Sequence, residues 1–344
     1  MNPNYSQNAD TTSTTGVTAI LSRIMRVKAR KTQLLSALGF LTPNFIGFLI
    51  FTAGPVLFSL VIAFSNWNLQ RTVTFQWVGF DNFVHLFHDQ QFWVYMVNTG
   101  YFLIGIPVSI AGSLALAILL NQNLKGMTIY RTLFYLPSFT AGVALMILWK
   151  NLYNPEFGPI NAVIEEVSRV LQLGIHGPQW LISTRNLLGI DVEQVRLVIQ
   201  QWGLGARDAI IIMGIWTAIG GSNMLLYIAA LTNLPEELVE AAQLDGAGKW
   251  QVFKNVTWPQ LAPTTFFIVV MSFIGGLQGG FEQARVMTNG GPAGTTTTIS
   301  YYIYTKAFEQ FQIGYASAVS WVLFAIIFAI TLVNWKLGNK EVSY

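Results

Sequence analysis

Long apolar runs without a charged residue dominate the chain. Six stretches contain no Asp, Glu, Lys or Arg, namely residues 38–64, 95–120, 133–149, 209–231, 263–281 and 315–335. Each is close to the roughly 17 to 25 residues that an α-helix needs to cross a hydrocarbon layer about 30 Å thick. The pattern predicts an all-α polytopic membrane protein with six transmembrane helices.

The composition supports this fold class and excludes several functions. Of the 344 residues, 53% are hydrophobic and 10% are charged, whereas soluble domains carry about 25% charged residues. The absence of cysteine excludes disulfides and thiolate metal sites, and His85, His88 and His176 are not spaced as metal ligands. The net charge of +3 comes from basic residues that flank the apolar runs. We therefore expect lipid contact and no nucleic-acid binding.

The basic residues predict the orientation. Residues 1–33 are polar and then basic, and we expect a disordered tail before the membrane domain 34–344. Short cytoplasmic loops are enriched in Lys and Arg. The first apolar run begins too late and is too long for a cleaved signal peptide. We therefore expect both termini in the cytoplasm, with basic inside loops at these residues: Lys125, Arg131, Lys249, Lys254, Lys336 and Lys340.

The segments 151–208 and 286–314 are then expected on the extracytoplasmic side. In the first, Ile160, Ile164 and Leu171 recur at helical spacing opposite Glu165 and Arg169, which predicts an amphipathic helix. It is either a cap on the helix bundle or a docking surface for an external partner, and the sequence leaves both open. A shorter amphipathic helix is expected from Asp81.

The inside segment 232–262 is the most informative part of the chain. Asn233 is a candidate N-cap, and Glu236 and Glu237 suit the positive end of a helix dipole. A glycine is favoured where a helix ends in the left-handed conformation, so we expect the helix to end at Gly246. A second short helix is expected over 248–256, before prolines mark re-entry into the membrane. The segment is either a packed hairpin or a docking element.

Within this segment the run Glu240-Ala241-Ala242, followed by Gly246 and then Val256 and Pro259, resembles the EAA motif of binding-protein-dependent ABC transporter permeases. Val256 and Trp258 replace the family's Ile and Leu. The resemblance implies the fold of a type I ABC importer permease. It also implies that this cytoplasmic coupling loop docks an ATPase subunit, through Glu240, Ala241, Ala242, Asp245 and Gly246.

Other motifs resemble the carbohydrate-uptake branch of that family, in particular its MalF-like and glycerol-3-phosphate-type subunits. They are Leu234 to Leu238, Asp245 to Ala247, Thr288 to Pro292, Gly314 to Ala318, and Tyr153 to Gly158. The stretch 184–207 is longer than is usual for the family, and we assign it no role.

The resemblance implies an assembly. Its members are this subunit, a second permease, two nucleotide-binding subunits and an extracytoplasmic solute-binding protein, in a bacterial-type cytoplasmic membrane. The sequence contains no G-x-x-x-x-G-K-[ST] phosphate loop. ATP and Mg²⁺ are therefore expected on the partner ATPase, and this chain is expected to be neither an enzyme nor a cofactor-binding subunit.

A carbohydrate path is expected near the membrane midplane, where glycines, amides, hydroxyls and aromatic rings suit a sugar. The candidates are Ser222, Asn223, Tyr227, Ser272, Gly275, Gly276, Gln278, Gly279, Phe281 and Glu282. Ordinary helix packing is the competing reading of these residues. Glu282 either pairs with Arg285 or contacts sugar.

Two other classes of function fit the sequence less well. An ion-coupled secondary sugar transporter would need intramembrane charges for its coupling ion. The charge-free runs offer none, and Glu282, just after the fifth run, is the one exception near a span. A membrane-embedded enzyme would need a catalytic cluster, which these runs also lack. The sugar itself is not identified by the sequence.

Overall fold

The computed structural model of the chain describes residues 36–70, 74–122, 125–140, 142–191 and 196–338. These residues are almost entirely helical, and within them one short antiparallel pair of strands is formed. The predicted tail 1–33 lies outside the described residues. The chain divides into two units, Met1–Val61 and Ile62–Tyr344, and each is described by itself.

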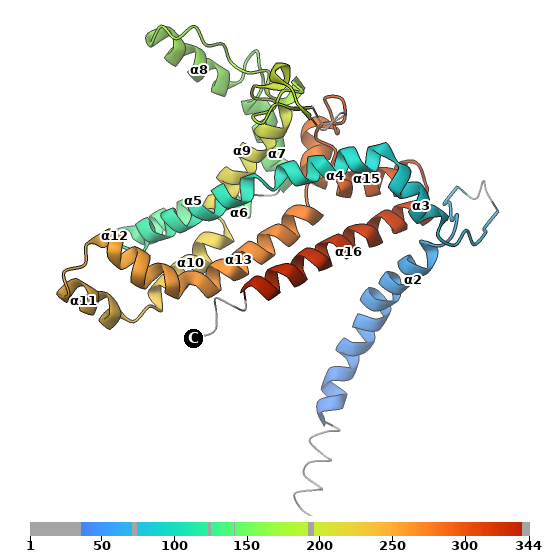
Figure 1. Cartoon of the computed structure of the whole chain (residues 1–344), viewed down its shortest axis with the longest axis horizontal. Coiled ribbons are helices and arrows are strands. Elements are labelled where there is room, and N and C mark those ends of the chain that lie inside the picture. The colour runs from blue at the N-terminus through green and yellow to red at the C-terminus, as the bar shows by residue number, and fades with distance from the viewer. Residues whose placement is uncertain (1–35, 71–73, 123–124, 141, 192–195, 339–344) are drawn as a thin grey trace, which may run out of the picture. The chain divides into compact units, whose positions relative to one another are not determined.

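The elements alternate between long apolar helices and short connecting ones (Figure 1). In chain order they are η1 (Leu49–Ala53), α2 (Gly54–Ile62), α3 (Asp81–His88), α4 (Gln90–Phe102), α5 (Gly105–Leu120), α6 (Met127–Phe139), α7 (Gly142–Leu152), α8 (Pro159–Val170), η2 (Trp180–Ile182), β1 (Ile190–Asp191), β2 (Arg196–Leu197), η3 (Ile199–Gln201), α9 (Ala206–Ile219), α10 (Ser222–Thr232), α11 (Glu236–Leu244), α12 (Lys249–Val252), η4 (Phe253–Thr257), α13 (Trp258–Gln278), α14 (Phe281–Gln283), η5 (Ala284–Thr288), α15 (Ile299–Tyr304), η6 (Thr305–Glu309) and α16 (Ile313–Gly338).

Within the described residues, five continuous helices are long and apolar enough to cross a membrane. They are Ser36–Ile62, Gln90–Leu120, Ala206–Thr232, Lys249–Gln278 and Ile313–Lys336. A sixth candidate is a bent pair formed by α6 and α7. The predicted all-helical class is thus confirmed, with six spans if the bent pair counts as one.

The first of these helices, as far as Val61, is the part of the first unit that the structure describes. Its large apolar side chains are exposed on every side, including Phe40, Phe51 and Leu57. A helix that is apolar all round needs an apolar environment such as lipid or another helix. It contains a π turn at Leu49–Ala53, where the Gly54 N–H donates to the Leu49 carbonyl immediately before Pro55.

The second unit is built around α5, α9, α10, α13 and α16. Helix α5 packs on α9 and α10, and α13 contacts α5, α10 and α16. Figure 1 shows α5, α13 and α16 side by side, with α11 at one end of this bundle. One buried cluster joins α5, α10 and α13 through residues such as Ala117, Tyr227 and Leu261. This cluster fixes the helices next to the predicted coupling loop.

The third predicted span, 133–149, is not one straight helix. Helices α6 and α7 meet at an angle of 94°. Pro137 lies in the last turn of α6, where it has no N–H to donate, and Thr140 adopts an extended conformation that ends the helix. An apolar run by itself does not reveal such a bend.

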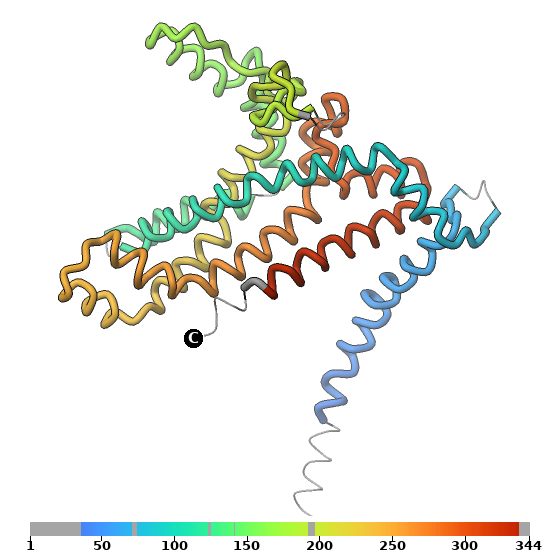
Figure 2. Tube along the Cα trace, in the orientation of Figure 1, coloured from blue at the N-terminus to red at the C-terminus, as the bar shows by residue number. Residues whose placement is uncertain are grey.

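The expected separate helix over 248–256 is wrong. Helix α12 continues through η4 into α13, so that one helix runs over Lys249–Gln278, as the trace in Figure 2 shows. At η4 the Trp258 N–H donates to the Phe253 carbonyl, five residues back. Such a π-type turn lets the helix continue through Pro259, which cannot donate.

The segment between α7 and α9 contains the predicted amphipathic helix, observed as α8. Ile160 and Ile164 pack on a cluster that includes Trp180 and Tyr153. Val163, Val167 and Leu171 remain exposed. The helix is therefore confirmed, while its apolar face is only partly covered by the described residues. Beyond it, β1 pairs antiparallel with β2, and η3 follows.

Candidate functional site

The EAA-like motif folds as a short helix, α11, closed by a tight turn. The expected Asn233 N-cap is wrong, because the Asn233 N–H donates to the Ala229 carbonyl and so ends α10. Pro235 is the N-cap of α11, with extended φ and ψ. Glu236 and Glu237 occupy the first turn, where the helix dipole favours acidic groups.

The end of α11 is the predicted one. Gly246 has φ of +85°, its N–H donates to Gln243 and the Ala247 N–H donates to Ala242. Both bonds together form a Schellman motif, which satisfies the last carbonyls of a helix. The next helix is capped from within, because Gln251 Oε1 accepts from the Gly248 N–H at 2.7 Å. The turn between α11 and α12 is therefore fixed by backbone bonds.

The surface of α11 is open. Glu240, Ala241, Asp245 and Gly246 are exposed and Ala242 is half-buried. Glu240 also borders a groove of about 990 Å³ between α11, η4 and the ends of α5 and α10. It makes no hydrogen bond or ion pair with the part of the chain that the structure describes.

Helices α11 and α12 and the turn between them form a projection, which we call the knob. Sequence reasoning missed two large apolar side chains on it. Leu244 is 89% exposed and Trp250 is 71% exposed. Leu238, one and a half turns before Leu244, is also exposed. Solvent-facing apolar residues on a capped, rigid projection are typical of a docking surface. Their position in the sequence next to the EAA residues was the signal that could have identified them as part of the surface.

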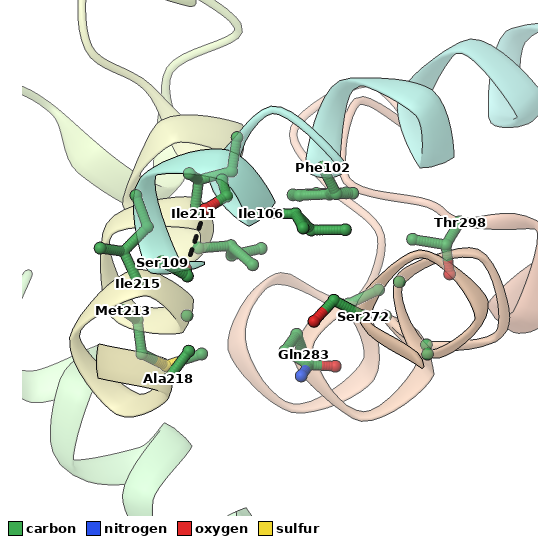
Figure 3. Close-up of a pocket in the computed structure, with 18 of the residues that line it drawn as sticks. Phe102, Ile106, Ser109, Ile211, Met213, Ile215, Ala218, Ser272, Gln283 and Thr298 are labelled. Atoms are coloured by element: carbon green, nitrogen blue, oxygen red, sulfur yellow. Dashed lines mark hydrogen bonds between the residues drawn. The ribbon is translucent and has the colours of Figure 1, made fainter. Parts of the chain in front are cut away.

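A second candidate site is a cavity of about 320 Å³ between α4, α5, α9, α10 and α13 (Figure 3). Phe102 and Ile106 approach from one side, and Ile211 and Ile215 from another. The polar groups of its wall are few, which is typical of a ligand pocket. They come from Ser109, Asn223, Ser272, Gln283 and Thr298.

The cavity collects half of the predicted path residues. Those that line it are Asn223, Ser272, Gly275, Gly276 and Gly279. A Cβ on Gly275 would meet no atom within 4 Å, so this glycine leaves space open. A Cβ on Gly276 would lie 2.7 Å from Leu103 Cδ2, so this glycine permits close packing of α13 on α5.

The other predicted path residues do not line this cavity. Tyr227 is fully buried in the α5, α10 and α13 cluster, and its hydroxyl donates to Thr265 Oγ1 at 3.2 Å. Phe281 packs on Tyr301 and Tyr304. Ser222, Gln278 and Glu282 are exposed. The contacts of Tyr227 and Phe281 are those of ordinary helix packing, which was the alternative to a role in the sugar path.

The expected pair of Glu282 and Arg285 is wrong. Arg285 forms its ion pair with Glu309 and also donates to the Tyr301 hydroxyl. Its guanidinium lies 5.3 Å from the centre of the Tyr304 ring. The Glu282 carboxylate lies instead against α7, with Oε2 3.1 Å from the position of a Cβ on Gly142. Although Glu282 lies only about one helical turn before Arg285 in the sequence, Arg285 pairs with Glu309 on η6 instead.

Sequence reasoning also missed wall residues from elements that it did not consider. Ser109 and Phe102 come from the second span, and Gln283 and Thr298 come from the segment after α13. The Ser109 hydroxyl donates to the Gly105 carbonyl at 2.8 Å. The spacing of Gly105, Ser109 and Gly112 on one helix face was a signal of close approach between helices. Within the described ranges, no group of acidic, His or Cys side chains is arranged to hold a metal ion.

The helical bundle, the capped turn between α11 and α12 and the cavity between spans are typical of the membrane-embedded permease class of transport proteins. The pattern of the family described as "Binding-protein-dependent transport system inner membrane component" matches residues 109–335, which is most of the chain. This chain belongs to that family. It is thus a transport component of an inner-membrane family, with several helices that can span a membrane.

Relatives extend over nearly the whole chain. The "Probable ABC transporter permease protein YesP" of Bacillus subtilis (strain 168) is 36% identical over 315 residues, covering 90% of this chain and 92% of that protein. The "Multiple sugar-binding transport system permease protein MsmF" of Streptococcus mutans is 28% identical and covers 85% of this chain and 91% of that protein. A solved structure is also similar, a bacterial ABC transporter "involved in the import of the acidic polysaccharide alginate". Its TM-score is 0.71 at 25% identity, covering 94% of this chain and 100% of that one.

Proposed function

We propose that this chain is one of two different permease subunits of an ATP-driven, binding-protein-dependent importer of carbohydrate. Family membership supports the permease role. The substrate class is supported by the relatives, whose names include "Multiple sugar-binding transport system permease protein MsmF" and "sn-glycerol-3-phosphate transport system permease protein UgpA". The particular sugar or sugar derivative is set by the binding protein and the pore together.

The observation that carries the proposal is the set of exposed side chains on α11 and α12. Two exposed apolar side chains, Leu244 and Trp250, flank an exposed carboxylate, Glu240, on a helix pair whose turn is fixed by the Schellman bonds. Because such a rigid knob bends little, it transmits the movement of a bound partner to the helices that it joins. An ATPase subunit that grips this knob moves α12 and α13 with it, because α12, η4 and α13 are one continuous helix.

Helix α13 couples this knob to the cavity between the spans. It contributes Ser272, Gly275 and Gly276 to the wall of that cavity. A displacement at Lys249 is therefore carried along a single helix to the site where we place the sugar. The apolar walls suit a sugar ring face, and the hydroxyls and amides suit sugar hydroxyls. Alternating access then follows from the ATPase pair opening and closing.

The assembly and its orientation complete the proposal. ATP and Mg²⁺ bind the two nucleotide-binding subunits and not this chain. Both termini and α11 lie in the cytoplasm, while α8 and the hairpin β1–β2 face outward toward the solute-binding protein. The complex lies in a bacterial-type cytoplasmic membrane. An alginate importer has been solved "in complex with alginate pentasaccharide-bound periplasmic protein", which supports a binding protein on the outer side.

The runner-up function is ion-coupled secondary sugar transport. It is favoured by one observation that the charge-free runs did not reveal, the buried charges Arg207 and Asp208 at the first turn of α9. Both lie at the end of a span rather than at its middle, which disfavours an ion path through them. Uptake that persists after ATP depletion and stops with a protonophore would establish this alternative.

The decisive experiment reverses the charge of the knob. Glu240→Lys should reduce binding of the ATPase subunits, because reversing one member of an interfacial charge pair costs about 2 to 5 kcal/mol. The matched control is Glu165→Lys, the same charge change at an exposed site on α8. We expect co-purification of the ATPase subunits and ATP-dependent sugar uptake to fall with the first variant alone. Normal co-purification and uptake in Glu240→Lys would mean that α11 is a packed hairpin.

A further inference from the structure

A third cavity, of about 530 Å³, lies at the end of the second unit opposite to α11. It opens where the first turn of α9 meets the first turns of α4, the 184–201 segment and the turn at 293–295. Its wall is rich in polar side chains, including Gln90, Gln91, Tyr95, Thr184, Gln201 and Arg207. The volume is within the range of about 300 to 1,000 Å³ that small ligands use.

Arg207 is the unusual member of this wall. It is 2% exposed, and its buried Nε and Nη1 atoms have no hydrogen-bond partner among the described residues. Within the same part of the chain, only Nη2 has an acceptor, a long contact of 3.5 Å to the Ile190 carbonyl. Buried donors are nearly always satisfied in folded proteins, and one left without a partner costs about 1 to 3 kcal/mol, more when the group is charged. A ligand that accepts hydrogen bonds would remove this cost.

The neighbouring carboxylate does not satisfy Arg207. Asp208 Oδ1 accepts from the Tyr101 hydroxyl at 2.7 Å. Its Oδ2 accepts from the backbone N–H groups of Leu187 and Gly205, each at 3.2 Å. The guanidinium instead lies over the Tyr101 ring, 4.9 Å from its centre. Arg207 is thereby held in place with two nitrogen atoms, Nε and Nη1, left to donate to another molecule.

The charges around the cavity indicate what that molecule is. Asp191 and Asp208 lie close enough to stabilise the Arg207 cation electrostatically. The site is thus charge-balanced rather than strongly basic, which disfavours a free phosphate or carboxylate as the recognised group. Guanidinium donors, amides, a threonine hydroxyl and the Tyr95 ring suit a neutral polyol, because hydroxyl groups accept and donate hydrogen bonds and a sugar ring face covers an aromatic ring.

We propose that this cavity is an entry subsite that binds the hydroxyl groups of one sugar unit before the sugar reaches the cavity between the spans. The proposal rests on the proposed function. The two cavities share no lining residue. Arg207 lies in the first turn of the helix pair Ala206–Thr232, whose other end adjoins the coupling segment, so the subsite faces outward in the proposed orientation. This assigns a role to the long 184–207 stretch, which supplies Thr184, Gln201 and Arg207 to the wall.

Protection from a thiol reagent tests the subsite, since the chain has no cysteine of its own. Gln201→Cys places a thiol in the wall, and Gln200→Cys places one on the same turn, η3, at an exposed residue that does not line the cavity. The full complex with its binding protein is labelled in proteoliposomes with an impermeant maleimide. Maltotriose and a digalacturonate serve as neutral and acidic probes, and uptake of each is measured in parallel.

We expect the imported sugar to protect Gln201→Cys and not Gln200→Cys. At a sugar concentration about nine times Kd the labelling rate falls about tenfold, since only free sites react. Adding Arg207→Lys should abolish this protection. Because Arg207→Lys could prevent folding, Thr184→Val, which removes one wall hydroxyl, is the second variant, and it should raise the sugar concentration needed for half-maximal protection.

Two results overturn the subsite while leaving the importer intact. One is sugar uptake by the wild type with no protection of Gln201→Cys. The other is protection that is unchanged by both Arg207→Lys and Thr184→Val. A complex that hydrolyses ATP but imports neither probe counts instead against the proposed function. Measuring uptake and protection on the same vesicles keeps these failures distinguishable.

Discussion

The Ala247 N–H donates to the Ala242 carbonyl over 3.0 Å, across a turn in which Gly246 has φ of +85°. This bond joins the last residue of the EAA run to the residue after the turn glycine. It sets the direction in which the chain leaves α11 and enters α12. The geometry of the knob therefore depends on one residue that accepts a left-handed conformation.

Gly246→Val should damage coupling without removing any charged contact. A left-handed conformation costs an L-residue about 1 to 2 kcal/mol, and a β-branched side chain is especially unfavourable there. A Cβ at Gly246 meets no atom within 4 Å, so the effect is conformational and not a steric clash. We expect co-purified ATPase and uptake to fall while pairing with the second permease persists.

Gly246→Asn is the control for that variant, because asparagine tolerates the left-handed region better than other non-glycine residues. It should retain most of the uptake that Gly246→Val loses. Equal activity of both variants and the wild type would show that the turn is not needed for docking.

Two adjacent glycines of α13 should respond differently to leucine. At Gly275 the space is open and belongs to the cavity, so Gly275→Leu should fill the sugar path and reduce uptake while the complex assembles normally. At Gly276 a Cβ already lies 2.7 Å from Leu103 Cδ2 and 3.0 Å from Ile106 Cδ1. Overpacking of this kind typically costs about 1 to 3 kcal/mol.

The measurement for this pair combines uptake with thermal stability of the purified complex. Gly275→Leu should lower uptake at an unchanged Tm, and Gly276→Leu should lower Tm as well. Normal uptake in Gly275→Leu would exclude this cavity from the sugar path.

The sequence predicted the elements that depend on local chemistry. The left-handed Gly246 and the acidic first turn of α11 follow from rules that act within a few residues. The amphipathic helix observed as α8 was predicted from the helical spacing of its apolar residues. These features do not depend on what the rest of the chain does, and the structure confirms them.

Other features depended on distant residues and were not predictable. Arg285 takes Glu309 as partner, 24 residues away, rather than the nearby Glu282. The continuation of α12 into α13 depends on a π turn that makes room for Pro259. The wall of the cavity between spans includes Ser109 and Thr298, which only tertiary packing brings together with α13.

Asp89 should make stability dependent on pH. Its Oδ1 accepts from the Gln91 N–H at 2.9 Å, and its Oδ2 accepts from the Tyr302 hydroxyl and, at 2.7 Å, from the Tyr315 hydroxyl. Burial alone would raise the pKa of Asp89, but these hydrogen bonds, with Lys306 nearby, lower the pKa below its ordinary value of 3.8. The folded state therefore binds the ionised form more strongly than the unfolded state does.

The sign of the effect follows from this lowered pKa. The stabilisation is present above about pH 4 and is lost as pH falls through the folded-state pKa. Asp89→Asn should lower the free energy of unfolding at pH 7 by about 1 to 3 kcal/mol, because bonds to a charged acceptor are replaced by weaker ones. Asparagine still caps α4, so the N-cap is retained.

Thermal unfolding of the purified protein at pH 7 and near pH 3 checks this prediction. The Tm difference between wild type and Asp89→Asn should be large at pH 7 and should shrink at the acidic pH. Tyr315→Phe is the companion variant, and its effect should largely vanish in the Asp89→Asn background. A Tm difference that is constant with pH would contradict the role of the ionised carboxylate.

The orientation of the chain is open to a direct labelling test, and the structure selects the positions. Ser168 looks suitable in the sequence, but it is 6% exposed and its Oγ accepts from the Ile175 N–H at 2.7 Å. Glu165 on the same helix is exposed, and Leu244 on α11 is 89% exposed. A cysteine at either site reacts without background, since the chain has none. An impermeant maleimide applied to intact cells, stripped of any outer barrier, should label Glu165→Cys at once, and it should label Leu244→Cys only after permeabilisation. The opposite pattern would invert the proposed topology and remove α11 from reach of a cytoplasmic ATPase.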